Sequence, residues 1–86
     1  IKETYMKEYG KDTIEIHKDA IEPDDVVLIH DDLLATGGSM KAAYNLVQKF
    51  NPKKTYINFI IELTIEGLKG REMFNEDTEI TTLLTI

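Results

Sequence analysis

A change of hydrophobic period in the middle of the chain most constrains its fold. Residues 26–29 form a short β-branched and aliphatic run between polar clusters, a pattern typical of a strand that is covered on both faces. From residue 40 to residue 50 the apolar side chains recur at steps of three and four, which predicts an amphipathic helix ending before Asn51 and Pro52. Residues 56–63 are again apolar and rich in β-forming side chains. Strand, helix and strand in this order predict a right-handed βαβ unit with a parallel sheet.

The two ends of the chain have weaker patterns. Residues 1–10 mix charged and aromatic side chains without a clear period, so we expect a mobile loop, and Gly10 followed by Lys11 and Asp12 predicts a turn. Ile14 and Ile16 alternate with polar residues as in a half-buried strand, which makes a hairpin around Gly10 plausible. Residues 79–86 predict a third strand of the main sheet, and residues 66–74 predict a short helix or an ordered loop.

Composition narrows the class of partner. The chain has 86 residues and no cysteine, so we expect one small core with uncovered apolar surface, and a piece of a longer protein. The 16 acidic residues outnumber the 10 basic ones, a balance that disfavours nucleic acid as a partner. The chain has no apolar run long enough to cross a membrane, and together with the missing cysteine this favours the cytoplasm.

Residues 31–39 connect the first predicted strand to the helix and carry an anion-binding pattern. Gly37 and Gly38 have no Cβ, so their backbone N–H groups can come close to a phosphate. The N-terminus of the following helix also favours an anion, and Thr36 and Ser39 add hydroxyl donors. The alternative is that Thr36 or Ser39 only caps the helix and that the glycines only make a turn.

Two adjacent carboxylates precede this phosphate pattern. Asp31 and Asp32 would repel a phosphate, so they are expected to accept hydrogen bonds from a vicinal diol and to orient a hydrated magnesium ion. An acid pair before a phosphate site predicts binding of a ribose 5-phosphate. A Walker loop is excluded because no lysine follows the glycines, and a dinucleotide fold is excluded because GxGxxG is missing.

The sequence VVLIHDDLLATGGSM at residues 26–40 resembles the phosphoribosyl-diphosphate (PRPP) binding motif of type I phosphoribosyltransferases. DDLLATGG with a following hydroxyl residue is the form typical of the adenine phosphoribosyltransferase family. The resemblance implies the α/β fold of that family, a mainly parallel sheet flanked by helices, of which this chain would be the C-terminal portion with a partial core and a hairpin closing loop. His30 departs from the usual aliphatic residue, and we interpret it as a strand-end side chain on the face opposite Asp31. The implied substrate-binding residues are Asp31 and Asp32 for the ribose hydroxyls, and Ala35, Thr36, Gly37, Gly38 and Ser39 for the 5'-phosphate.

The resemblance extends to both sides of the motif. YMKEYG at residues 5–10 is similar to the YxxEYG segment of the family's closing loop, which implies that Glu8 is the acid/base group near the adenine ring and that Tyr9 lies beside it. From the residues alone, Glu8 is better interpreted as a solvated surface charge, and only the resemblance favours the catalytic role. Glu62–Leu63 and residues 68–72 are similar to the family's ELxxLxGRE region, with two additional residues between the pieces, and we interpret Arg71 as a surface arginine that binds no ligand.

The resemblance divides a single domain into three functional parts: residues 1–17 as a flexible catalytic hairpin, 26–50 as the PRPP-binding strand, loop and helix, and 55–86 as the remaining strands. The implied reaction transfers 5-phosphoribose from PRPP to adenine, forming AMP and pyrophosphate. Mg²⁺ would be bound mainly through PRPP or pyrophosphate, with no metal ligand assigned to the protein. We expect a cytoplasmic homodimer with no nucleic-acid or membrane partner. Three alternatives stay open: a PRPP-binding regulatory protein without catalysis, a phosphoribosyltransferase for another purine, and a phosphoreceiver domain.

Overall fold

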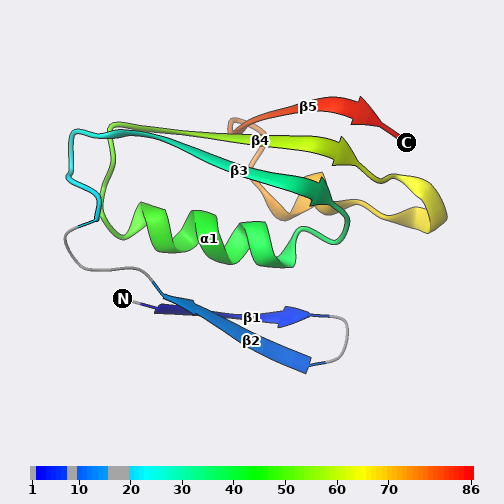
Figure 1. Cartoon of the computed structure of the whole chain (residues 1–86), viewed down its shortest axis with the longest axis horizontal. Helices are drawn as coiled ribbons and strands as arrows, with labels where there is room; N and C mark the ends of the chain where they lie inside the picture. Colours follow the sequence, from blue (N-terminus) through cyan, green and yellow to red (C-terminus); the bar gives the residue numbers. More distant parts are fainter. Residues whose placement is uncertain (1, 8–9, 16–19) are drawn as a thin grey trace.

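In the computed structural model a helix lies between a three-stranded sheet and a two-stranded hairpin (Figure 1). The structure describes residues 2–7, 10–15 and 20–86. Two 3-10 turns, η1 and η2, connect the second and third strands of the sheet. The elements are β1 (Lys2–Lys7), β2 (Gly10–Glu15), β3 (Val26–Leu34), α1 (Gly38–Gln48), β4 (Lys54–Glu62), η1 (Ile65–Gly67), η2 (Gly70–Met73) and β5 (Glu79–Thr85).

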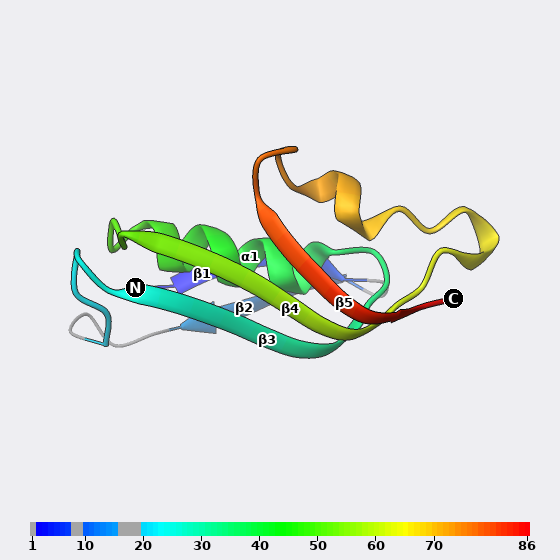
Figure 2. The ribbon, with the colours of Figure 1, turned by 90° about the horizontal axis from the view of Figure 1, so that it is seen from above.

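The main sheet has the order β3-β4-β5, and both pairs of strands are parallel. Figure 2 shows the three strands side by side, with α1 behind them. Because α1 returns the chain from the end of β3 to the start of β4, the predicted βαβ unit is confirmed. The amphipathic helix and the third strand are also found, and residues 66–74 form the predicted short helical turns.

The core lies between the sheet and α1. Its most buried members come from β3, α1, β4 and the segment after η2, so the connection after β4 is packed into the fold. The ring of Phe74 meets that of Tyr44 edge to face at a centroid distance of 5.8 Å. The core cluster consists of Leu34, Met40, Ile57, Phe59 and Phe74.

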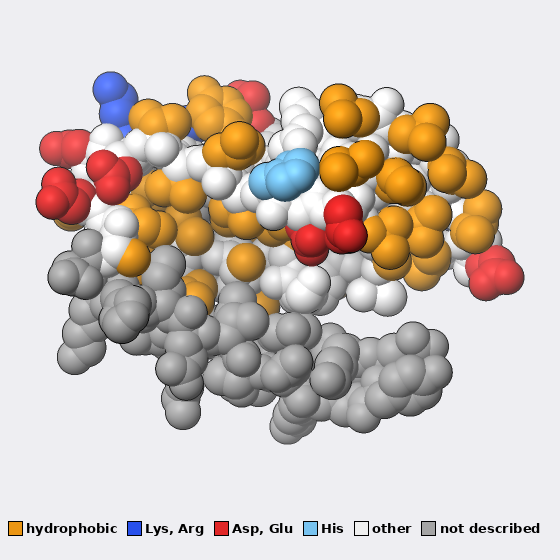
Figure 3. All heavy atoms as spheres, viewed as in Figure 1, with side chains coloured by type: hydrophobic (Ala, Val, Ile, Leu, Met, Phe, Trp, Pro, Cys, Tyr) orange, Lys and Arg blue, Asp and Glu red, His pale blue; other side chains and the backbone are white. Residues whose placement is uncertain are grey.

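The opposite face of the sheet is exposed among the described residues. Val26 and Leu28 are 61% and 64% exposed, whereas Val27 and Ile29 are partly buried. Figure 3, viewed as in Figure 1, shows hydrophobic side chains on the upper part of the surface, where the sheet lies. The prediction of a strand covered on both faces is therefore wrong for this part of the chain. A β-branched run suits any pleated surface, and α1 covers only one side of it.

The N-terminal segment differs from the expected loop. β1 and β2 pair antiparallel with Lys2 opposite Glu15 and Lys7 opposite Gly10, so the hairpin is confirmed, whereas residues 2–7 form a strand where a mobile loop was expected. Gly10, Lys11 and Asp12 belong to β2 and not to a turn. Strand pairing of this kind depends on backbone hydrogen bonds, which an aperiodic sequence can also form.

Candidate functional site

The junction between β3 and α1 is shorter than the sequence predicted. β3 continues through Leu34, because the backbone of its last residues still pairs with β4, with Asp31 opposite Phe59 and Leu34 opposite Glu62. Gly38 and Ser39 already belong to α1. Residues 35–37, called the junction loop below, are therefore the only ones between the two elements.

Gly37 controls how the chain enters the helix. It is the N-cap of α1 with φ 87° and ψ −5°, a left-handed conformation that favours glycine, and its carbonyl oxygen accepts the N–H of Lys41 at 2.8 Å. The helix start has no side-chain cap, so neither Thr36 nor Ser39 takes that position. The first N–H groups of a helix have no partner within it, and one of them, on Gly38, donates to the Thr36 hydroxyl. The Thr36 hydroxyl lies beside them, 3.5 Å from the Gly38 nitrogen.

The two predicted ribose-binding carboxylates lie at the end of β3. Neighbouring side chains of a strand point to opposite faces, so Asp31 shares the face that α1 covers and Asp32 shares the exposed face with His30. Asp31 is partly buried, and its Oδ1 accepts the backbone N–H of Asp32 at 2.8 Å. The structure thus places both carboxylates next to the junction loop, on either side of one strand.

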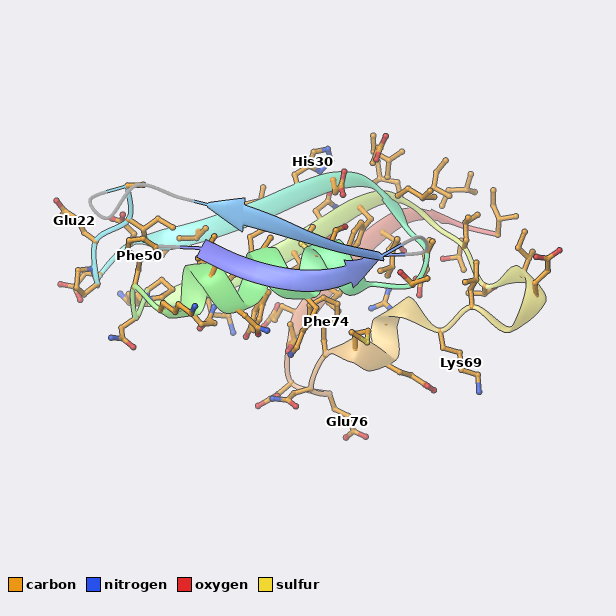
Figure 4. All side chains as sticks on the ribbon, turned by 90° about the horizontal axis from the view of Figure 1, so that it is seen from below. Glu22, His30, Phe50, Lys69, Phe74 and Glu76 are labelled. Carbon is orange, nitrogen blue, oxygen red and sulfur yellow. The ribbon has the colours of Figure 1, made fainter. Side chains whose placement is uncertain are left out.

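His30 takes part in a polar ladder across the exposed face of the sheet. Its Nδ1–H donates to Asn58 Oδ1 at 2.8 Å, and Asn58 Nδ2 donates to Thr81 Oγ1 at 2.9 Å. The three residues occupy paired positions on β3, β4 and β5. In Figure 4 the His30 side chain points away from α1, and in Figure 3 histidine lies beside acidic side chains. The interpretation of His30 as a strand residue opposite Asp31 agrees with this alternation.

Arg71 has a role that the sequence did not reveal. Its Nε donates to Glu62 Oε2 at 3.1 Å and its Nη2 to Glu62 Oε1 at 2.8 Å, while Nη1 donates to the carbonyl oxygen of Ile80 at 3.2 Å. The Glu62 side chain is only 10% exposed and that of Arg71 is 45% exposed. The hydrogen bonds from Arg71 lower the pKa of Glu62 below its ordinary value, although burial opposes this, and the same bonds raise the pKa of Arg71. Arg71 is therefore partly exposed, as predicted, but it also joins η2 to the end of β4.

A second missed feature is a direct backbone contact between the junction loop and η2. A Cβ built on Gly37 would lie 2.6 Å from the carbonyl oxygen of Gly70. A Cβ built on Gly70 would lie 2.5 Å from the carbonyl oxygen of Ala35. Both distances are too short for a real side chain, so the two backbones touch. No local sequence signal marks this contact, because the partners are far apart in the chain.

The predicted catalytic residues Glu8 and Tyr9 lie outside the described residues. Within the described part, no three His, Cys, Asp or Glu side chains are grouped to hold a metal ion. Asp31 and Asp32 supply carboxylate oxygens, the ligands Mg²⁺ prefers when substrate phosphates complete its coordination.

A surface hollow of about 590 Å³ is lined by residues of η2 and the segment leading into β5, and it does not include the junction loop. No helix among the described residues has the length and apolarity to cross a membrane.

The chain is similar to known proteins along its whole length. It is 63% identical over 86 residues to the adenine phosphoribosyltransferase of Phocaeicola vulgatus and 59% identical over 86 residues to that of Bacteroides thetaiotaomicron. Each alignment covers 100% of this chain and 48% of the relative, so the chain spans about half the length of the curated relatives it matches. No family model matches the chain.

Solved structures of adenine phosphoribosyltransferases have the same fold over the length of this chain. The adenine phosphoribosyltransferase of Rhodothermus marinus superposes with a TM-score of 0.89 at 46% identity, covering 100% of this chain and 48% of the other. The Saccharomyces cerevisiae enzyme, crystallised with an imino-altritol bisphosphate and adenine, gives 0.85 at 44% identity, covering 98% and 46%. The predicted fold class is thereby confirmed.

Proposed function

We propose that this chain, which is homologous along its whole length to adenine phosphoribosyltransferases, forms the part of such an enzyme that binds the ribose 5-phosphate portion of PRPP. The full protein would transfer 5-phosphoribose from PRPP to N9 of adenine, giving AMP and pyrophosphate. The observation that carries the proposal is the junction between β3 and α1. There a left-handed Gly37 turns the chain into the helix, and two carboxylates lie near the end of β3, just before this junction.

The 5'-phosphate would bind at residues 35–39. The backbone N–H groups at the start of α1 and the positive end of its dipole favour a dianion. The hydroxyls of Thr36 and Ser39 are both exposed and can donate to the phosphate oxygens. The N-cap residue Gly37 has no side chain that could cap the helix, which supports this assignment, although the Gly38 N–H already donates to the Thr36 hydroxyl at 3.5 Å.

The ribose hydroxyls would bind at Asp31 and Asp32. Ionised carboxylates only accept hydrogen bonds, so they suit a diol and exclude the phosphate from their end of the site. Mg²⁺ bound to the diphosphate of PRPP would neutralise charge on the leaving group. The two carboxylates would hold the ribose so that C1' faces the base while the bond to pyrophosphate breaks and the bond to N9 forms.

Glu8 and Tyr9 are proposed as the catalytic residues next to adenine. The Glu8 carboxyl would exchange a proton with the adenine ring as N9 becomes bonded to C1', and Tyr9 would lie beside it. A carboxyl group becomes easier to protonate when water is excluded, which brings it closer to the range in which it can transfer protons near neutral pH.

The decisive experiment is substrate titration of the full-length protein. Calorimetry with PRPP and Mg²⁺ should show binding, and addition of adenine should produce AMP and pyrophosphate in equal amounts. PRPP binding without turnover would instead indicate a regulatory protein, and turnover with hypoxanthine or guanine alone would indicate another purine specificity. A complex with AMP that places the ribose away from Asp31 and Asp32 would contradict the site.

We also propose that the full protein is a cytoplasmic homodimer, that it requires Mg²⁺, and that it has no nucleic-acid or membrane partner. The acidic composition supports the exclusion of nucleic acid. Light scattering of the full-length protein, with and without PRPP, would measure its oligomeric state. Chelation of Mg²⁺ should abolish AMP formation if the ion acts through the diphosphate.

A further inference from the structure

We infer that Gly70 is a positioning residue for the proposed phosphate site: the backbone of η2 packs against the junction loop, and the Glu62–Arg71 ion pair fixes η2 in place. This inference rests on the proposed function and deepens it, because it concerns what sets the geometry of the same site. The residue itself would touch neither PRPP nor adenine.

The contact between the two backbones leaves no room for a side chain on either side. The nearest atoms to a Cβ on Gly70 would be the Ala35 carbonyl oxygen at 2.5 Å and Leu34 Cδ1 at 2.7 Å. In the other direction, a Cβ on Gly37 would meet Gly70 and the side chain of Met73. A methyl group at Gly70 would therefore displace the junction loop, and with it the start of α1, from the position shown by the structure.

Glycine is needed at Gly70 for space and not for conformation. Its φ is not in the left-handed region, so an alanine there would carry no backbone strain. Gly67, only three residues earlier, has the opposite property. Its φ is 77°, but a Cβ there would meet nothing within 4 Å. The same connection thus offers two glycines that separate the effect of strain from the effect of a clash.

η2 is held by contacts of the residues that follow Gly70, so it can act as a fixed support. Arg71 joins it to Glu62 at the end of β4 and to the Ile80 carbonyl oxygen on β5. Phe74, just after η2, is buried in the core with Leu34 and Tyr44. In Figure 4 the Phe74 side chain lies against the helix, whereas Lys69 on the other side extends away from the fold. The Leu63 N–H also donates to the Leu34 carbonyl oxygen at 2.8 Å, which ties the end of β4 to the start of the junction loop.

A support of this kind matters because phosphate binding is sensitive to small displacements. Productive geometry at a binding site must be held to within about 0.5 Å, and a methyl group at Gly70 requires a larger shift of one of the two backbones. The adenine end of the site does not touch the junction loop in the proposed arrangement. Loss of the support should therefore weaken binding of the phosphate end and leave base recognition largely unchanged.

The test compares Gly70→Ala with Gly67→Ala in the full-length protein, using ribose 5-phosphate in calorimetry and PRPP with adenine in steady-state kinetics. For Gly70→Ala we expect ribose 5-phosphate affinity to fall, and the KM for PRPP to rise, by about tenfold or more. The KM for adenine and the kcat at saturating PRPP should stay within about threefold. Gly67→Ala should lower the melting temperature but keep ribose 5-phosphate affinity within about twofold.

Equal losses of ribose 5-phosphate affinity in the two variants, or normal affinity in Gly70→Ala, would overturn the inference. If Gly70→Ala does not fold, Arg71→Lys replaces it, since lysine keeps the charge but cannot make the paired hydrogen bonds to Glu62. A folded Arg71→Lys variant with unchanged KM for PRPP would equally overturn it. Failure of the unaltered protein to bind ribose 5-phosphate or PRPP is a different result, because it would reject the proposed function itself.

Discussion

The Glu62–Arg71 ion pair allows a quantitative test of how η2 is attached to the sheet. We expect Arg71→Met, which keeps much of the side-chain length but removes the guanidinium, to lower the free energy of unfolding substantially. Glu62 would then be left as a carboxylate with a side chain only 10% exposed and without its bidentate partner. The matched variants are Glu62→Gln and the double variant with both changes.

The magnitude follows from the burial of the two partners. Removing one member of a fully buried ion pair costs about 3 to 5 kcal/mol, whereas an exposed pair contributes less than about 1 kcal/mol. Here one partner is buried and the other is 45% exposed, so the value should be intermediate. We expect a loss of about 2 kcal/mol for Arg71→Met and somewhat less for Glu62→Gln. In the double variant the losses should overlap, with a coupling energy of about 1 kcal/mol or more.

The same pair gives a stability contribution with a defined pH dependence. The pKa of Glu62 is lowered from 4.5 in the folded state, mainly by hydrogen bonds from Arg71, so the folded state binds its proton more weakly than the unfolded state. The contribution is complete above the unfolded pKa and is lost as the pH falls through the folded pKa, which lies below 4.5. The difference in unfolding free energy between the unaltered protein and Glu62→Gln should therefore shrink as the pH is lowered from neutral into this acidic range.

Urea denaturation of the four full-length proteins, at pH 7 and at steps below the ordinary pKa of glutamate, measures both effects. Additive single losses at pH 7 would show that the two side chains act independently, and this would refute the ion pair. A difference between the unaltered protein and Glu62→Gln that does not change in the acidic range would refute the assigned pKa direction.

Four further changes should have separable effects. Gly37→Ala should lower the unfolding free energy by about 2 to 5 kcal/mol, because the alanine would be strained in the left-handed conformation and its Cβ would lie 2.6 Å from the Gly70 carbonyl oxygen. Gly38→Ala, inside α1, should change the unfolding free energy by less than about 1 kcal/mol. Equal urea midpoints for these two variants would contradict the junction geometry. Phe59→Ala should lower the unfolding free energy by about 3 to 5 kcal/mol in the same assay, because Phe59 is fully buried. A loss below about 1 kcal/mol would contradict the place of Phe59 in the core. Glu8→Gln should lower kcat for AMP formation by about a hundredfold with little change in PRPP affinity measured by calorimetry, and equal loss in both would make Glu8 a solvated surface charge.

The fold was predictable where one local pattern specifies one element. The apolar spacing from residue 40 to residue 50 indicated α1, and the β-branched runs indicated β3 and β4. The burial of β3 was not predictable in the same way, because an apolar run does not say how many faces are covered. Val26 and Leu28 are exposed among the described residues. The strand β1 was missed because its sequence has no alternation, and its backbone pairs with β2 all the same.

The candidate site was predictable in composition but not in geometry. The residue types at Gly37 and Gly38 indicated an anion site, yet only the structure shows that Gly37 carries the left-handed conformation and that Gly38 is already helical. The carboxylates were expected in a loop, and the structure places them within β3 because pairing with β4 extends the strand. The contact between Gly70 and the junction loop could not be predicted for a different reason. It is made by backbones that are distant in sequence, and no reactive or charged side chain takes part in it.

The contrast between Gly37, Gly67 and Gly70 shows how the junction loop of the proposed phosphate site acquires its geometry. Gly67 is required only by its own backbone dihedral, and Gly70 only by the atoms packed against it, whereas Gly37 is subject to both constraints. Because Gly37 and Gly70 contact each other, the left-handed turn that starts α1 and the position of η2 are coupled. The turn by itself would not fix the position of the junction loop relative to the sheet, since a loop of three residues can rotate about its two ends. The contact with η2 and the hydrogen bond from Leu63 to Leu34 remove that freedom from two directions. The geometry of the proposed phosphate site is therefore a property of the folded β3-α1-β4 unit together with the connection to β5, and not of the glycine motif alone.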